Sequence, residues 1–337
     1  MEQNKKRVFS GIQPSGSPTI GNYIGAIRNY VALQEEYECF YCIVDMHAIT
    51  VRQTPTELRA NTKSIFALLM ACGVDPDKCT LYVQSHVPEH AELCWILNCY
   101  TYMGEASRMI QFKEKSKAHE SNVNVGLFDY PVLQVADILL YQSHLVPIGE
   151  DQRQHLELTR DVALRFNNLY SPSFEVPDML IPKVGGRVMS LTEPTKKMSK
   201  SDEDPNSFIM LLDKPEDMQR KIKRAVTDSD NTIIYDPENK PGVSNLLEIY
   251  SIVTGKPLDD AAKDFENAAG YGVFKQAVAD AVVAKFEPIQ AEYKRLIGDK
   301  KYIEEMMSKG AQNAQRSAIR TLSKVKKKVG MVERPRI

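Results

Sequence analysis

Residues 7–22 read RVFSGIQPSGSPTIGN, and this stretch decides the fold. Its first four residues, Arg7 to Ser10, are expected to form a strand, and the turn formers glycine and proline recur from Gly11 to Pro18. A helix is expected from about Ile20 to Gln34, because apolar residues recur there at three- and four-residue spacing. A loop between the carboxyl end of a strand and the start of a helix is where open α/β sheets bind their ligands.

Two more strands and another helix continue this alternation. Residues 40–44 and 80–84 read FYCIV and TLYVQ, short apolar runs typical of buried strands. Between them, residues 54–57 read TPTE, the pattern of a capping box with proline at the first helical position. The helix that this box opens is expected to end at Gly73. The order β-α-β-α-β predicts a parallel, doubly wound sheet of the Rossmann type, and hence an α/β fold.

The rest of the chain becomes mainly helical. Residues 90–144 are expected to form a helical insertion, and residues 145–148 and 187–191 to add two more strands. Beyond Pro205, three stretches carry apolar residues at helical spacing, namely 243–253, 273–297 and 316–329. The pattern therefore predicts two domains.

The first predicted domain covers residues 1–205 and contains the Rossmann-type sheet, the insertion at about 90–144 and a loop at 197–201. The second covers residues 206–337 and is smaller and all-helical. A chain of 337 residues with 43% apolar and 26% charged residues can bury cores of this size.

Charge and hydropathy exclude several classes of protein. The net charge of −1 means that a nucleic-acid partner would have to meet a local basic surface and not a global field. No apolar run approaches the roughly 20 residues of a membrane span. Residues 1–7 lead at once into the first expected strand, so we expect no signal or transit segment. We expect a cytoplasmic protein without membrane association.

The cysteines and histidines do not suggest a metal site built from protein ligands. Cys39 and Cys42 have CxxC spacing, but they lie in an apolar strand, where residues three apart point to opposite faces. A second CxxC pair is missing, so buried structural thiols are expected. His86 and His90 are four apart, yet Pro88 between them disrupts a shared helical face.

Two motifs far apart in the chain suggest phosphate binding. Thr19-Ile20-Gly21-Asn22 opens a helix, whose free N–H groups and positive dipole end attract phosphate. Lys197-Met198-Ser199-Lys200-Ser201 places two lysines beside hydroxyl groups on a loop. Together they can hold a triphosphate from two sides. Taken singly, the first motif could be a plain helix cap and the second a solvated basic loop.

A third set of polar residues suggests a ligand with N–H donors. Asp137 lies in the apolar segment 130–141, where a carboxylate is costly to bury without a partner. Tyr130 and Gln134 share its helical face at spacings of four and three. A salt-bridged core carboxylate remains the alternative. Residues 149–152 follow a strand and suit ribose or amino-group recognition, or else a simple helix cap.

The C-terminal tail is basic. Residues 316–337 hold eight basic residues and one acidic residue, with an apolar stripe of Ile319, Leu322, Val325 and Val329. This pattern suits a helix that packs on the body and faces a phosphate backbone, although a solvated basic face would look the same.

Five segments carry a resemblance to a known family. In chain order they are Ser10–Gly16, Thr19–Asn22, Val44–Thr50, Gly149–Gln152 and Lys197–Ser201. This ordered set resembles bacterial-type tryptophanyl-tRNA synthetases, class I enzymes with a Rossmann-type catalytic domain and a helical anticodon-binding domain. The resemblance covers nearly the whole chain and implies that residues 206–337 bind the anticodon.

The resemblance implies a role for each matching residue. The catalytic groups would be Thr19, Asn22, Lys115, Lys197 and Lys200, with residues 19–22 as the HIGH motif and 197–201 as the mobile KMSKS loop. ATP would contact Gln13, Pro14, Ser15, Gly21, Asn22, Gly149, Glu150, Asp151, Val188, Lys197, Met198, Ser199, Lys200 and Ser201. Tryptophan would contact Phe9, His47, Tyr130, Gln134, Asp137, Val146, Ile148 and Gln152, with Asp137 accepting the indole N–H.

The implied reaction has two steps. ATP with Mg²⁺ activates L-tryptophan to tryptophanyl-adenylate, and the 3′-terminal ribose of tRNA(Trp) then receives the amino acid. The resemblance also implies a homodimer. One residue departs from the family, because Gln134 stands where methionine is common, and it could bond the substrate amino group or Asp137.

Two alternatives are weighed against this reaction. A tyrosyl-tRNA synthetase shares the architecture and the lysine loop. A non-catalytic paralogue that binds tryptophan or RNA would be expected to lack the helix-opening glycine or the lysines, but Gly21, Lys197 and Lys200 are all present.

Overall fold

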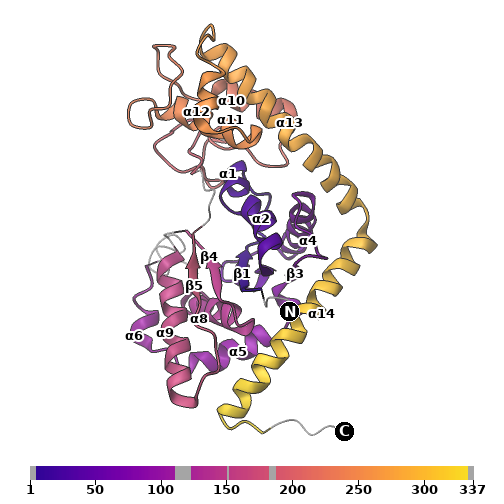
Figure 1. The fold of residues 1–337 in the computed structure, drawn as a ribbon. Coiled ribbons are helices and arrows are strands. Elements are labelled where there is room, and N and C mark those ends of the chain that lie inside the picture. The colour runs from indigo at the N-terminus through magenta and orange to yellow at the C-terminus, as the bar shows by residue number, and fades with distance from the viewer. Residues whose placement is uncertain (1–4, 111–122, 150–151, 182–186, 333–337) are drawn as a thin grey trace.

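The fold is built on a parallel five-stranded sheet (Figure 1). The computed structural model describes residues 5–110, 123–149, 152–181 and 187–332. The strands are β1 (Arg7–Ile12), β2 (Glu38–Ile43), β3 (Thr80–Val83), β4 (Leu145–Pro147) and β5 (Asp178–Leu180), in the order β3-β2-β1-β4-β5. The order reverses between β1 and β4, and in such sheets the ligand crevice lies at that point. The predicted doubly wound sheet is confirmed.

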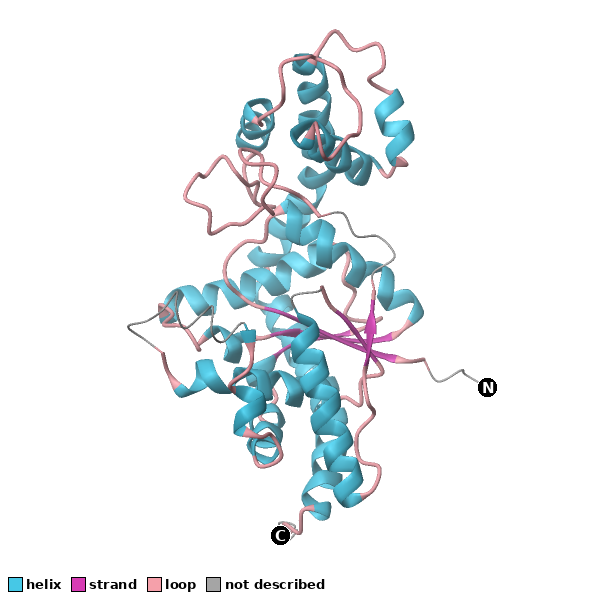
Figure 2. Ribbon diagram, turned by 90° about the vertical axis from the view of Figure 1, so that its left-hand side faces the viewer, coloured by secondary structure: helices cyan, strands magenta, loops and turns pink. Residues whose placement is uncertain are grey.

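Alternate residues of each strand face two different cores. Val8, Tyr41 and Leu81 lie in one apolar cluster, whereas Phe9 and Phe40 lie in the other. The first cluster includes α1 (Ile20–Asn22), α2 (Arg28–Glu36) and α4 (Pro55–Ala71), and the second includes α5 (Glu89–Asn98), α8 (Val125–Leu140) and α9 (Arg153–Tyr170). Figure 2 shows the sheet between these helical layers. Cys39 and Cys42 are buried in opposite clusters, as predicted.

The first helix is confirmed, with one local change of winding. Residues 20–36 are continuously helical, but Tyr23–Ile27 forms a π-helical turn between α1 and α2. The helix predicted after residue 54 is also confirmed, with Pro55 in its first turn. The predicted capping box is wrong, because the Thr54 side chain makes no cap bond and only its carbonyl accepts Leu58 N–H at 2.9 Å.

One predicted strand is wrong and one real strand was not predicted. Residues 187–191 make only an isolated bridge between Met189 and Lys197. The reason is that Asn245 of the helical region bonds both the N–H and the C=O of Met189, at 2.8 and 3.0 Å, in place of a neighbouring strand. The fifth strand is instead β5, a three-residue edge strand with no clear apolar pattern.

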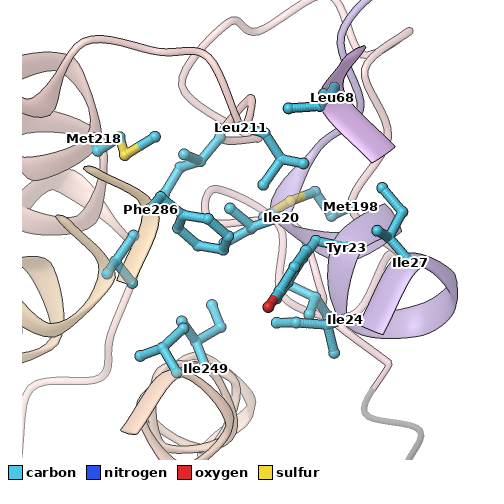
Figure 3. Packing of buried hydrophobic residues seen from close by; sticks show 14 of the residues in the cluster. Ile20, Tyr23, Ile24, Ile27, Leu68, Met198, Leu211, Met218, Ile249 and Phe286 are labelled. Atoms are coloured by element: carbon cyan, nitrogen blue, oxygen red, sulfur yellow. The ribbon is translucent and has the colours of Figure 1, made fainter. Parts of the chain in front are cut away.

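Beyond residue 205 the described residues form helices and loops. The helices are α10 (Pro215–Arg224), α11 (Pro241–Thr254), α12 (Leu258–Lys263), α13 (Tyr271–Gly298) and α14 (Lys300–Lys328). Figure 3 shows that Phe286 of α13 packs against Ile20 and Tyr23 of the first helix, in the same cluster as Met198. The helix that follows β1 is therefore held by the helical region, while the predicted boundary near residue 205 stays a prediction.

The last helix returns to the sheet. α14 lies along β3 (Figure 1), and a Cβ atom added to Gly310 would stand only 1.8 Å from the Leu81 carbonyl oxygen. Its buried stripe is Ala314, Ala318, Leu322 and Val325. The predicted stripe is wrong at Ile319, which is 48% exposed because it lies one residue beyond the contact face. Among the helices that the structure describes, none combines the length and apolarity needed to cross a membrane.

Candidate active site

A large cavity lies where the strand order reverses. Its volume is about 940 Å³, and its walls come from β1, β4, the first helix and α8. It is lined by all the residues predicted to contact tryptophan: Phe9, His47, Tyr130, Gln134, Asp137, Val146, Ile148 and Gln152. Gln13 and Gly149, both predicted to contact ATP, also line it.

Asp137, in the cavity wall, accepts three side-chain hydrogen bonds. Its Oδ2 lies 2.7 Å from Nε2 of His47, which belongs to α3 (Asp45–Ala48) after β2. Its Oδ1 lies 2.8 Å from Nε2 of Gln84 and 2.6 Å from Nδ1 of His90. Asp137 is thus both a paired carboxylate of the core and part of the cavity wall. The prediction and its alternative each describe one side of this residue.

The charge state of Asp137 follows from these contacts. Burial by itself would raise the pKa of the carboxyl group, which is 1% exposed. The opposing interactions with His47 and His90 prevail and lower its pKa below the usual range. Asp137 is therefore a carboxylate that only accepts hydrogen bonds, so Gln84, His90 and His47 must each donate to it.

Gln84 and His90 were not predicted as site residues. Gln84 lies in the short 3₁₀ turn Gln84–His86 directly after β3, and His90 lies at the start of α5. The available signal was positional, because a polar residue immediately after a buried strand lies at the ligand-binding edge of the sheet. In the sequence, His90 was considered only as a possible metal ligand. Within the described ranges, no three His, Cys, Asp or Glu side chains gather to form a metal site.

The cavity wall also carries an amide pair and a tyrosine. Gln134 Nε2 donates to Gln152 Oε1 at 3.4 Å, and not to Asp137. The hydroxyl of Tyr130 lies 3.1 Å from Nε2 of His155, which is buried. Gln152 is the N-cap residue of α9, makes no side-chain cap bond and lines the cavity.

The first turn of the helix after β1 has a defined cap. Thr19 and Asn22 form a reciprocal capping box, in which Thr19 Oγ1 accepts from Asn22 N–H at 3.2 Å and Asn22 Oδ1 accepts from Thr19 N–H at 2.9 Å. The suggested helix cap is therefore present. A Cβ atom on Gly21 would stand 3.6 Å from Val188 and 3.7 Å from Met198, at van der Waals distance, so the lysine loop lies close to the helix.

The lysine loop is attached to the loop after β1. Lys200 Nζ donates to the carbonyl oxygen and the hydroxyl of Ser15, at 2.5 and 2.7 Å. Burial lowers the pKa of Lys200. Met198 is buried and its N–H donates to the Val188 carbonyl at 3.0 Å, whereas Lys197 is exposed. The structure thus gathers Ser15, residues 19–22, Val188 and the lysine loop at one end of the first helix.

The remaining predicted residues have simple placements. Pro14 lies in the loop after β1 beside Ser15 and is buried. Ser199 and Ser201 are exposed, and their hydroxyl groups are 2.8 Å apart. Lys115, Glu150 and Asp151 lie outside the described residues.

Comparisons identify one group of similar proteins. Residues 1–287 match the family described as "tRNA synthetases class I (W and Y)". The chain is 55% identical over 332 residues to a tryptophan–tRNA ligase of Clostridium tetani, with 98% of each chain covered. It resembles the structure of tryptophanyl-tRNA synthetase from Mycoplasma pneumoniae with a TM-score of 0.86 and 34% identity, over 97% of this chain and 98% of that one. For the Campylobacter jejuni tryptophanyl-tRNA synthetase complexed with ADP and tryptophan, the TM-score is 0.83 and the identity 33%, over 96% and 100% of the two chains.

Proposed function

The chain belongs to the class I tRNA synthetases for tryptophan and tyrosine, and we propose that its central cavity binds tryptophan beside ATP. It is a tryptophan–tRNA ligase, which activates L-tryptophan with ATP and transfers it to tRNA(Trp). The observation that supports this use of the cavity is the convergence of Asp137 and the other predicted tryptophan contacts on one 940 Å³ space. No side chain needs to act as a nucleophile in this reaction, because positioning and charge stabilisation can provide the rate.

At the Asp137 end, recognition rests on hydrogen-bond matching. Oδ2 of Asp137 would accept the indole N–H, while Phe9, Val146 and Ile148 enclose the ring. Tyr130 and Gln152 would hold the α-amino group. Phenylalanine offers no N–H and would leave the buried carboxylate without that partner, and polar recognition of this kind can discriminate by about 10⁴–10⁵.

At the other end, the first helix and the lysine loop would hold the triphosphate. Lys200 would leave Ser15 for the phosphate oxygens and offset the charge that grows as pyrophosphate departs. Gln13, Gly21 and Asn22 would contact the nucleotide from the helix side, and Val188 the adenine. Lys115, Glu150 and Asp151 keep the roles that the resemblance implies. Mg²⁺ would come with ATP, bound mainly by phosphate oxygens, and would neutralise part of their charge.

The second step needs a surface for tRNA, and α14 offers one. Arg316, Arg320, Lys324 and Lys327 are exposed at spacings of four, four and three, which places them on one face of the helix. Such a basic stripe suits a phosphate backbone. Changing Arg316 and Arg320 together to Glu should raise the KM for tRNA at least tenfold and leave tryptophan activation unchanged. The same double change to Glu at Lys300 and Lys301, exposed at the other end of α14, is the control, and equal effects of the two double changes would count against this surface.

We also propose a cytoplasmic homodimer. Large apolar side chains are exposed on α5, α6 (Met103–Ala106) and the start of α8, among them Trp95 at 70%, Met103 at 70% and Val125 at 81%. Exposed apolar patches of this kind are typical of association surfaces. Light scattering should give twice the chain mass, and Trp95→Glu should shift the protein toward monomer. A wild-type protein that stays monomeric at micromolar concentration would exclude the dimer.

The decisive experiment is amino-acid-dependent ATP–pyrophosphate exchange with Mg²⁺. Tryptophan, tyrosine and phenylalanine are compared in parallel on the same preparation. Exchange with tryptophan alone supports the proposed site. Exchange with tyrosine would favour the sister specificity, and absence of exchange with all three would favour a protein that only binds its ligands.

A further inference from the structure

We propose that Gln84 and His90 are positioning residues that orient Asp137 so that its Oδ2 atom recognises a ligand N–H. This inference rests on the proposed function of the cavity and identifies what determines its specificity. Neither residue lines the cavity, and both are completely buried, so neither can touch the substrate itself. They would act only through Asp137.

The argument starts from the two oxygen atoms of Asp137. Gln84 and His90 both donate to Oδ1, at 2.8 and 2.6 Å, from the side away from the cavity. A carboxylate oxygen has about two acceptor positions, so these two donors occupy Oδ1. Oδ2 receives one hydrogen bond, from His47, which does line the cavity. The remaining acceptor position of the carboxylate is therefore on Oδ2, at the cavity wall.

Both positioning residues are themselves fixed. Gln84 Oε1 accepts the N–H of Met46 at 3.1 Å, and its Nε2 donates to Asp137. Gln84 therefore links Asp137 to the short helix that carries His47. Nε2 of His90 lies 2.8 Å from the hydroxyl of Tyr141 and 3.2 Å from that of Tyr82. The carboxylate of Asp137, on α8, is thus held at once from α3, from the turn after β3 and from α5. Loss of one donor to Oδ1 would let the carboxylate rotate and present its oxygens differently, without changing the shape of the cavity.

This distinction between orientation and shape gives the test. The probe pair is tryptophan and β-(3-benzothienyl)alanine, a tryptophan analogue in which sulfur replaces the indole N–H within a similar bicyclic ring. For each enzyme variant, kcat/KM is measured for both compounds by ATP–pyrophosphate exchange. The ratio of the two values reports N–H recognition, whereas a merely structural defect lowers both values together.

Two substitutions at position 90 have matched shapes. His90→Leu removes the donor to Asp137, while His90→Asn keeps an N–H at the place of Nδ1. Both lose the contacts of Nε2 with the tyrosines, so these contacts cancel in the comparison. We expect the tryptophan-to-analogue ratio to fall about tenfold or more in His90→Leu, and to stay within about threefold of wild type in His90→Asn. Gln84→Met removes the other donor to Asp137 with a side chain of similar length, and its ratio should fall as in His90→Leu. If His90→Leu does not fold, Gln84→Met tests the proposal in its place.

Three results would overturn the proposal. A parallel loss for both compounds in His90→Leu and Gln84→Met would show a structural role only. A ratio that falls equally in His90→Asn and His90→Leu would exclude the donated hydrogen bond as the cause. If wild-type enzyme itself uses both compounds equally, Asp137 does not recognise the N–H at all. That last result would contradict the role proposed for Asp137. The first two would contradict only the positioning role of Gln84 and His90, so the two kinds of failure can be distinguished.

Discussion

The two ends of the proposed ligand site, the Asp137 wall of the cavity and the lysine loop beside the first helix, are built in opposite ways. Asp137 is 1% exposed and accepts hydrogen bonds from three buried side chains. Lys200 lies on a loop whose other polar side chains are exposed, and Ser15 is the residue that its ammonium group contacts. The first end is arranged before any ligand arrives, whereas the second must exchange its protein contacts for phosphate.

Because of this difference, we expect Asp137 to affect stability and binding, and Lys200 to affect the reaction rate. A buried carboxylate with three donors contributes to folding, because removal of one partner leaves the others unsatisfied. A lysine on a surface loop contributes little to folding but can act where charge develops in the transition state. Substitutions at the Asp137 end should therefore change stability and selectivity together, and substitution of Lys200 should change the rate alone.

The largest expected effect is on folding at the Asp137 end. Asp137→Ala would leave Gln84, His47 and His90 without their acceptor, and we expect the free energy of unfolding to fall by about 3–5 kcal/mol. Urea denaturation followed by circular dichroism measures it. Asp129→Ala, on the same helix, removes a half-buried acceptor of Asn98 and should lower stability by only about 1 kcal/mol. Equal effects of the two changes would contradict the special status of the Asp137 network.

At the lysine end the expected effect is on the reaction. Lys200→Ala should slow adenylate formation by about 10²–10³-fold, which corresponds to about 2.7–4 kcal/mol of transition-state stabilisation. Tryptophan binding and the midpoint of thermal unfolding should change little. Lys196→Ala is the neighbouring control, because Lys196 is exposed and paired with Glu193 at 2.7 Å. Pre-steady-state adenylate formation and tryptophan titration separate the two quantities, and unchanged turnover in Lys200→Ala would refute the role of this loop.

Acid should affect the Asp137 end in a defined direction. The folded-state pKa of Asp137 lies below the value of about 3.9 expected for an unfolded chain. Its stabilising contribution is therefore complete above that value and is lost as the pH falls toward the folded pKa. The difference in unfolding free energy between wild type and Asp137→Asn should be constant from pH 8 to 5. Below about pH 4 it should shrink by up to about 1.4 kcal/mol per pH unit. A difference that already shrinks between pH 7 and 5 would contradict this.

The comparison also explains what could be predicted from the sequence. Strands β1, β2 and β3 are short apolar runs bounded by turns, so periodicity and length suffice to find them. The strand β5 has three residues, none of them buried, and is defined only by pairing with β4. Conversely, residues 187–191 look like a strand, but the Asn245 amide takes the backbone bonds of Met189. Contacts of that kind join residues far apart in sequence and leave no local signal.

The candidate site divides in the same way. Tyr130, Gln134 and Asp137 could be grouped because helical spacing places them on one face, and the structure puts all three in the cavity wall. Gln84 and His90 reach Asp137 from two other elements across 53 and 47 positions of sequence. No periodicity connects such residues. A search for polar residues directly after buried strands would have found Gln84, whereas His90 becomes visible only once α5 is packed on α8.

The smallest effects should come from the outer part of the Asp137 network. Nδ1 of His90 donates to Asp137, so a ring without a second proton has one lone pair on Nε2, to which only one of the hydroxyl groups of Tyr141 and Tyr82 can donate. Tyr141 is the nearer by 0.4 Å, from 2.8 and 3.2 Å. Tyr141→Phe should therefore lower the unfolding free energy by about 0.5–1.5 kcal/mol, and Tyr82→Phe by less.

The double variant is the sharper measurement. When Tyr141 lacks its hydroxyl, Tyr82 can take over as donor to His90, so each single change hides part of the loss. We expect the double variant to lose more stability than the sum of the two single variants, and to lower the tryptophan-to-analogue ratio where neither single variant does. Additive losses, or a ratio that is unaffected in the double variant, would mean that the orientation of Asp137 is fixed without the tyrosines. In that case Gln84 and His90 would orient Asp137 by themselves, and Tyr141 and Tyr82 would play no part in specificity.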